Sequence, residues 1–153
     1  MKAVYRWWAT WVFLAIIAQI GLAGVGAFYA GHKTDNGGVV NSDTFDHGFG
    51  PHIFWGYFGV GLSIIIFVVI GLIAGIGKWR LGRQGILFLL FVLQVILAGV
   101  GFSFPALGFL HPINALVIFT LAGSIVYTSW RDARAPAPEP AASAPVPEAS
   151  AAE

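Results

Sequence analysis

Hydrophobic residues in this chain form long runs that are separated by short polar segments. No Asp, Glu, Lys or Arg lies in residues 7–32, 47–77 or 84–130. A helix that crosses a bilayer needs about 20 apolar residues, so the first two runs each hold one span and the third holds two. The pattern therefore predicts four membrane spans. Their approximate ranges are 8–30, 51–77, 85–104 and 111–129.

The composition agrees with this pattern. Of the 153 residues, 58% are hydrophobic and 10% are charged, whereas soluble domains carry about 25% charged residues. This composition therefore argues against an independently soluble domain. Short connections make consecutive helices antiparallel neighbours, so we predict an all-α membrane protein, a four-helix antiparallel transmembrane bundle. Residues 31–50 are rich in polar and turn-forming residues and predict an outer loop, with Pro51 at the first helical position of the second span.

The chain divides into two regions. Residues 1–134 hold the predicted transmembrane domain, and residues 135–153 are rich in alanine and proline. Repeated proline prevents a continuous helix, and little apolar bulk remains to build a core. We therefore expect residues 135–153 to be a disordered cytoplasmic tail.

The basic residues are distributed unevenly between the two sides of the predicted bundle. Seven of the eight fall on one side: Lys2, Arg6, Lys78, Arg80, Arg83, Arg131 and Arg134. By the positive-inside rule, both termini are expected in the cytoplasm, with the protein in a bacterial inner membrane. So little basic surface makes nucleic acid a poor partner. The expected partner is the lipid bilayer.

A short segment occurs twice in the chain. Residues 19–26 and 94–101 are identical at six of eight positions, and each begins with glutamine and ends in Leu-Ala-Gly-Val-Gly. The repeat predicts two helical hairpins related by an axis along the membrane normal. Tight helix packing is the simpler interpretation of the repeated glycines. The alternative is that they leave room for a flat ligand.

All four histidines lie on the predicted outer side, at His32, His47, His52 and His111. Under the repeat, His52 and His111 begin equivalent spans, which face each other diagonally across the bundle. Haem iron takes axial ligands from opposite faces of its ring, and helical bundles supply such ligands from facing helices. We therefore predict a haem b site with His52 and His111 as iron ligands and His47 as the weaker alternative. A role for each histidine in local hydrogen bonding is also open.

Other residues are predicted to complete this site. Four glycines would make room for the ring, and Asn114, one turn after His111, would orient that imidazole. The glycines are Gly24, Gly26, Gly99 and Gly101. Aromatic side chains would form the walls of the pocket. They are Phe54, Trp55, Phe102, Phe104 and Phe109.

A metal site in the outer loop is a second possibility. Nitrogen and oxygen ligands of the kind that bind zinc or copper occur there. They are His32, Asp43, Asp46, His47 and His52. No GxSxG sequence, Walker loop or pair of intramembrane carboxylates is present, so the sequence gives no support for an independent catalytic activity.

The repeated segments also carry a family resemblance. Gln19-x-x-Leu22-Ala23-Gly24 and its second copy, residues 94–99, are each followed by a span that opens with histidine. This arrangement resembles one half of haem A synthase, a family built from four-helix haem-binding halves. The resemblance implies that His52 and His111 are axial ligands. The chain has Ile53 where the resembled motif commonly has arginine, and it has no second half, so synthase activity is not expected.

Two further motifs resemble a family of uncharacterised bacterial four-helix membrane proteins. The sequence His52-Ile-Phe-Trp-Gly56-Tyr57 opens the second span, and the Leu-His-Pro-x-Asn-Ala motif at residues 110–115 opens the fourth. Together, the observations favour a haem-binding protein that transfers electrons, or a haem-carrying subunit of a respiratory or photosynthetic membrane complex. The alternative is a cofactor-free accessory subunit that packs against other membrane proteins.

Overall fold

The computed structural model describes residues 1–134. Every regular secondary-structure element in that range is a helix. The predicted tail at residues 135–153 lies outside the described residues. The helices are α1 (Lys2–Asp35), α2 (Ser42–Phe54), the π-helix η1 (Trp55–Gly61), α3 (Leu62–Ala74), α4 (Lys78–Ser103), α5 (Pro105–Gly108) and α6 (Leu110–Arg134). The prediction of an all-α protein is confirmed.

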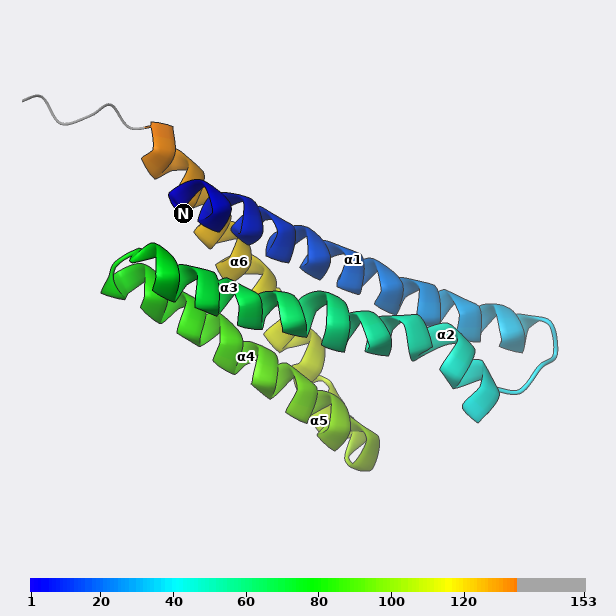
Figure 1. The fold of residues 1–153 in the computed structure, drawn as a ribbon. Coiled ribbons are helices and arrows are strands. Elements are labelled where there is room, and N and C mark those ends of the chain that lie inside the picture. The colour runs from blue at the N-terminus through cyan, green and yellow to red at the C-terminus, as the bar shows by residue number, and fades with distance from the viewer. Residues whose placement is uncertain (135–153) are drawn as a thin grey trace, which may run out of the picture.

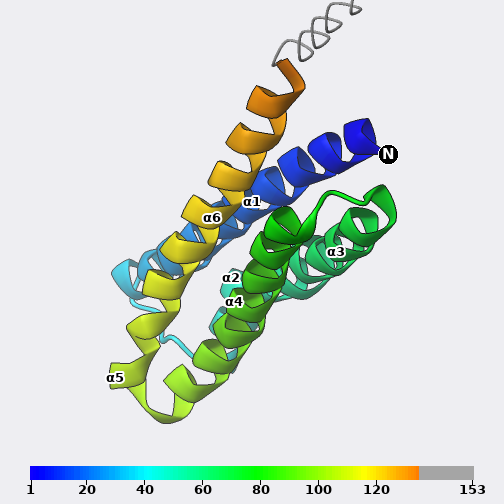
Figure 2. The same ribbon diagram turned by 90° about the vertical axis from the view of Figure 1, so that its left-hand side faces the viewer.

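These elements form four long helical segments, as Figure 1 shows: α1, the continuous α2–η1–α3, α4, and α5 with α6. Each segment is long enough and apolar enough to cross a membrane. Helix α1 packs on α3 and α6, and α4 packs on the same two helices. The second segment therefore lies diagonally opposite α6, as the repeat predicts, and the chain forms a four-helix bundle of two hairpins (Figure 2).

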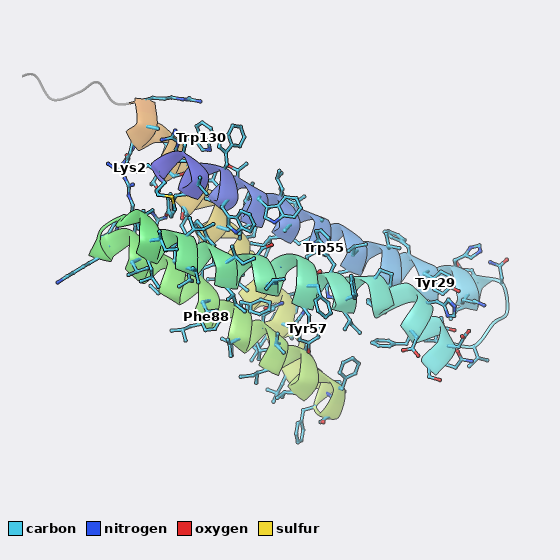
Figure 3. All side chains as sticks on the ribbon, in the orientation of Figure 1. Lys2, Tyr29, Trp55, Tyr57, Phe88 and Trp130 are labelled. Atoms are coloured by element: carbon cyan, nitrogen blue, oxygen red, sulfur yellow. The ribbon has the colours of Figure 1, made fainter. Side chains whose placement is uncertain are left out.

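The two ends of the bundle differ in how closely the hairpins pack. The start of α1 and the end of α6 lie together at one end of the bundle, which we call the terminal end (Figure 1). The end of α1, α2 and the start of α6 carry the four histidines at the opposite end, which we call the histidine end. In Figure 3, Lys2 and Trp130 mark the terminal end and Tyr29 the histidine end. Buried hydrophobic residues fill the bundle from the terminal end to its middle: Tyr5, Ala9, Val12, Ala15, Ile16, Val60, Ile64, Phe67, Leu87, Ile118, Ala122 and Ile125. The hairpins diverge towards the histidine end (Figure 1).

Polar contacts join the helices at the terminal end. The Arg83 guanidinium donates to the Ser124 hydroxyl at 2.6 Å and to the Thr128 hydroxyl at 3.0 Å. On the other hairpin, the indole N–H groups of Trp8 and Trp11 both donate to Ser63, each at 2.9 Å. Buried polar groups are stable where such partners satisfy them. These contacts hold α4 to α6 and α1 to α3.

The outer loop is much shorter than the sequence predicts. Helix α1 continues to Asp35 and α2 begins at Ser42, so only residues 36–41 connect them. The Asn41 side chain accepts the Thr44 N–H at 2.9 Å, which caps α2. Asp43 in the first turn also favours the helix through its dipole. The predicted loop at 31–50 was therefore wrong: its polar residues lie mostly on capped helices. Pro51 lies inside α2 and not at its first position.

The second span widens into the π-helix η1 directly after α2. A methyl group added at Gly59 would lie 2.3 Å from the Trp55 ring, so glycine is needed there to accommodate the indole. The Trp55 Nε1–H donates to the backbone oxygen of Ala15 at 3.0 Å. Short π-helical segments within α-helices frequently occur at functional sites. This one begins three residues after His52.

Candidate functional site

The two histidines predicted as ligands make the same hydrogen bond in the two hairpins. His52 Nδ1 lies 3.1 Å from the backbone oxygen of Gln19, and His111 Nδ1 lies 3.1 Å from that of Gln94. A carbonyl oxygen only accepts hydrogen bonds, so each Nδ1 carries the proton. Each Nε2 therefore keeps its lone pair, the form in which a neutral imidazole binds a metal.

A second pair of contacts repeats one turn further on. The residue three positions after each histidine donates a side-chain N–H to a backbone oxygen. That oxygen belongs to the residue four positions before Gln19 in the first hairpin and four positions before Gln94 in the second. Trp55 donates to Ala15 at 3.0 Å, and Asn114 donates to Leu90 at 2.9 Å. The internal repeat therefore extends from the sequence to the hydrogen bonds. In each hairpin, we call the histidine, the residue three positions later and their two hydrogen bonds to backbone oxygens a histidine clamp.

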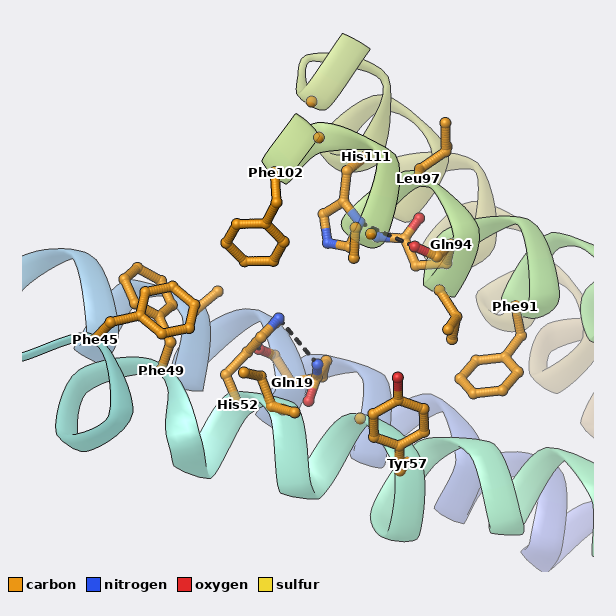
Figure 4. A pocket seen from close by; sticks show the side chains of 18 residues that line it. Gln19, Phe45, Phe49, His52, Tyr57, Phe91, Gln94, Leu97, Phe102 and His111 are labelled. Atoms are coloured by element: carbon orange, nitrogen blue, oxygen red, sulfur yellow. Dashed lines mark hydrogen bonds between the residues drawn. The ribbon is translucent and has the colours of Figure 1, made fainter. Parts of the chain in front are cut away.

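A cavity of about 690 Å³ lies between the hairpins at the histidine end. Figure 4 shows His52 on α2 and His111 on α6 on opposite sides of it, together with Gln19 and Gln94. Cofactor and small-molecule sites typically measure about 300–1,000 Å³ and are lined mostly by apolar and aromatic groups. The aromatic lining residues are Phe45, Phe49, Tyr57, Phe91 and Phe102.

Aromatic contacts bound this cavity. The Phe45 ring meets the Phe102 ring edge-on with centroids 5.5 Å apart, which joins α2 to α4 at the histidine end. Towards the middle of the bundle, Phe91 packs against η1, where a methyl group on Gly61 would lie 2.6 Å from its ring. Tyr57 and Phe102 line the cavity and still expose 53% and 71% of their surface. The cavity therefore opens sideways between α4 and the helix formed by α2 and η1.

The side chains of the two glutamines have different partners. Gln19 Nε2 lies 3.2 Å from His52 Nε2, which the dashed line in Figure 4 marks. Gln94 Oε1 accepts the Asn114 Nδ2–H at 2.7 Å instead. Gln19 Oε1 is buried and has no hydrogen-bond partner. The lone pair of His52 thus has an amide donor beside it, whereas no hydrogen bond to His111 Nε2 occurs within the described residues.

The four predicted glycines differ in their surroundings. Gly99 and Gly101 line the cavity, but Gly24 and Gly26 do not. A methyl group on Gly26 would lie 2.6 Å from the Phe49 ring, so Gly26 makes room for that side chain. Gly101 approaches Gly108, whose Cα would lie 2.9 Å from an added methyl group. Of the four predicted glycines, only the two of the second hairpin therefore border the proposed ligand space.

Asn114 and the predicted aromatic walls also differ from expectation. Asn114 bonds to Leu90 and Gln94 and makes no hydrogen bond to His111; the backbone of Gln94 orients that ring. Of the five predicted wall residues, only Phe102 lines the cavity. Phe45 and Phe49 were missed because they fall in the segment predicted as a loop. The cap formed by Asn41 and Thr44 is the sequence signal that predicts a helix there.

The remaining histidines lie away from the cavity. His47 is exposed, and its Nδ1 contacts Asp43 at 2.8 Å to the backbone oxygen and 3.2 Å to the carboxylate. Within residues 1–134, no group of three or more His, Cys, Asp or Glu side chains is placed to hold a metal ion. The alternative metal site in the outer loop is therefore not assembled. Two histidines on facing helices remain as the candidate ligands.

Comparison with protein-family models, curated proteins and solved structures gives no match to this chain. The class is therefore defined by the fold: an all-α four-helix bundle whose helices can each cross a membrane.

Proposed function

We propose that the protein binds one haem b at the histidine end, with His52 and His111 as axial ligands, and serves in electron transfer. One observation supports the proposal most strongly: equivalent backbone carbonyls accept a hydrogen bond from Nδ1 of both imidazoles. The Nε2 lone pair of each ring therefore points away from that carbonyl. The two histidines also border one cavity.

The residues fit the requirements of this cofactor. The porphyrin supplies four ligands, so the protein needs to supply only two, from opposite faces of the ring. The hydrogen bond from Nδ1 to a carbonyl fixes the tautomer and the orientation of a ligating histidine. The walls are mostly apolar, and apolar surroundings would influence the potential of a bound haem iron. A bound haem would supply one-electron chemistry, and the chain would supply and orient its two histidine ligands.

The test is the visible spectrum of the full chain, purified in mild detergent after expression with adequate haem supply. We expect a Soret band and, after reduction with dithionite, an α band. His52→Ala and His111→Ala should each abolish or shift these bands, while the matched control His47→Ala should leave them unchanged. A wild-type protein with no Soret band would contradict the proposal and favour a cofactor-free accessory subunit.

The membrane and orientation form the second part of the proposal. The excess of Lys and Arg at the terminal end supports a bacterial inner-membrane location with both termini in the cytoplasm. The histidine end would then face outward, where a haem-carrying subunit could exchange electrons with a respiratory or photosynthetic complex. Topology reporters inserted in the 36–41 connection should report the outer side. A cytoplasmic signal from that position would overturn this orientation.

A further inference from the structure

The contact between Gln19 and His52 is made by the lone pair that an iron ligand needs. Since His52 Nδ1 donates to the backbone oxygen of Gln19, His52 Nε2 is an acceptor, and the Gln19 amide at 3.2 Å is the donor. The same geometry leaves Gln19 Oε1 buried without a partner. The Gln19 amide nitrogen thus gives His52 Nε2 a hydrogen bond, while the oxygen of the same amide accepts none.

The difference between the two hairpins follows from the residue three positions after each histidine. An amide group has two N–H hydrogens, and an indole has one. Asn114 gives one hydrogen bond to Leu90 and a second to Gln94 Oε1. Trp55 has a single hydrogen, which goes to Ala15. The second hairpin therefore ties its glutamine away from the histidine, and the first hairpin has no donor left to do so.

The neighbouring position also differs between the hairpins. A methyl group added at Gly56 would lie 2.9 Å from Gln19 Nε2, so glycine provides the space for this amide. The equivalent residue of the second hairpin, four positions after His111, is Ala115. Both differences act together: the first clamp lacks the donor that would hold its glutamine, and it has the space that lets the amide reach the histidine.

We propose that Gln19 gates the haem site by occupying the lone pair of His52. His111 would hold the iron without rearrangement, whereas His52 would hold it only once the Gln19 amide has moved away. This inference rests on the proposed function and extends it, because it makes the two axial ligands inequivalent. Gln19 acts through His52 and is a positioning residue.

The hydrogen bond itself can be tested without any haem. The full chain, labelled with ¹⁵N-histidine and kept free of haem, is compared with Gln19→Leu by NMR. We expect both His52 and His111 to be protonated at Nδ1, and the Nε2 resonance of His52 alone to move in Gln19→Leu. An unchanged His52 Nε2 resonance would overturn the proposed gate.

The consequence for ligand binding is tested by titrating the haem-free chain with haemin. Removing one hydrogen bond should tighten binding about three- to tenfold in Gln19→Leu, and Gly56→Ala should act in the same direction by displacing the amide. The control His47→Ala, whose side chain lies away from the cavity, should bind as the wild type does. Gln94→Leu should not tighten binding, because the Gln94 side chain makes no hydrogen bond to His111 Nε2. Equal effects at both glutamines, or none at Gln19, would overturn the gate. Failure of the wild type to bind haemin would instead overturn the proposed function.

Discussion

The two hairpins place their histidines with the same backbone contacts and then treat the free side of each ring differently. His52 and His111 donate to equivalent carbonyls at the same distance, 3.1 Å. Beyond that bond, the Gln19 amide meets His52, whereas Asn114 holds Gln94 away from His111. A duplicated scaffold thus positions two equivalent candidate ligands, while two differences between the hairpins make their availability unequal: Trp55 in place of Asn114 and Gly56 in place of Ala115.

The same contrast appears at a pair of equivalent glycines. Gly26 in the first hairpin faces the Phe49 ring, and Gly101 in the second faces the backbone of Gly108. Glycine at these positions therefore serves a side-chain contact in one hairpin and a close approach of two backbones in the other. Both copies of the repeat need glycine at this position, but the group that leaves no room for a Cβ is a side chain in one hairpin and a backbone in the other.

The largest predicted effect is on the ligands themselves. His111→Ala should weaken haemin binding more than His52→Ala, because it leaves only the histidine whose lone pair is already bonded to Gln19. Both losses should exceed the roughly 10- to 100-fold that loss of a supporting hydrogen bond costs at a metal site. Haemin titration of the two variants measures the difference. Stronger binding by His111→Ala than by His52→Ala would contradict the inequality of the clamps.

The second prediction concerns the paired glycines. Gly101→Ala should destabilise the bundle by about 1–3 kcal/mol, since an added methyl group meets backbone that cannot rotate away. Gly26→Ala should cost less, because the Phe49 side chain has rotamers available. Gly99→Ala and Gly24→Ala are matched controls whose added methyl groups meet nothing within 4 Å. Unfolding in detergent measures all four; a larger loss in Gly26→Ala would reverse the comparison.

The third prediction converts the second clamp into the first. Asn114→Leu combined with Ala115→Gly removes the donor that holds Gln94 and adds the space that Gly56 provides in the first hairpin. The Gln94 side chain should then bond to His111 Nε2. We expect haemin affinity to fall by about threefold, the value of one hydrogen bond between membrane helices. The His111 Nε2 resonance should move towards that of His52 in the haem-free chain. If the His111 Nε2 resonance does not move in this double variant, residues 114 and 115 are not what distinguishes the two hairpins.

The smallest effect is expected at the indole. Trp55→Phe removes the bond to the Ala15 oxygen while keeping an aromatic ring beside Gly59. Because polar contacts between membrane helices contribute about 0.6 kcal/mol on average, the loss of stability should be of that size. The His52 Nε2 resonance should stay unchanged, since Trp55 does not bond to Gln19. A shift there would show that Trp55 also restrains the glutamine.

The four spans could be predicted because charge is so costly in a bilayer that its absence over long runs is decisive. The repeated glutamines likewise indicated the two hairpins and the helices that hold His52 and His111. The helical extension through residues 42–50 was not predicted, because polar composition conceals a capped helix. The inequality of the two clamps could not be predicted from the sequence. It arises because Trp55 has one N–H hydrogen and Asn114 has two, and only the three-dimensional packing identifies the oxygens that accept them.

The central claim is that His52 and His111 together hold one haem. Electron paramagnetic resonance of the ferric, haemin-loaded full chain tests it most directly. We expect a low-spin signal typical of two imidazole ligands, which becomes high-spin in His52→Ala and in His111→Ala and is unchanged in His47→Ala. A high-spin wild type, or a low-spin signal that survives both single substitutions, would contradict it.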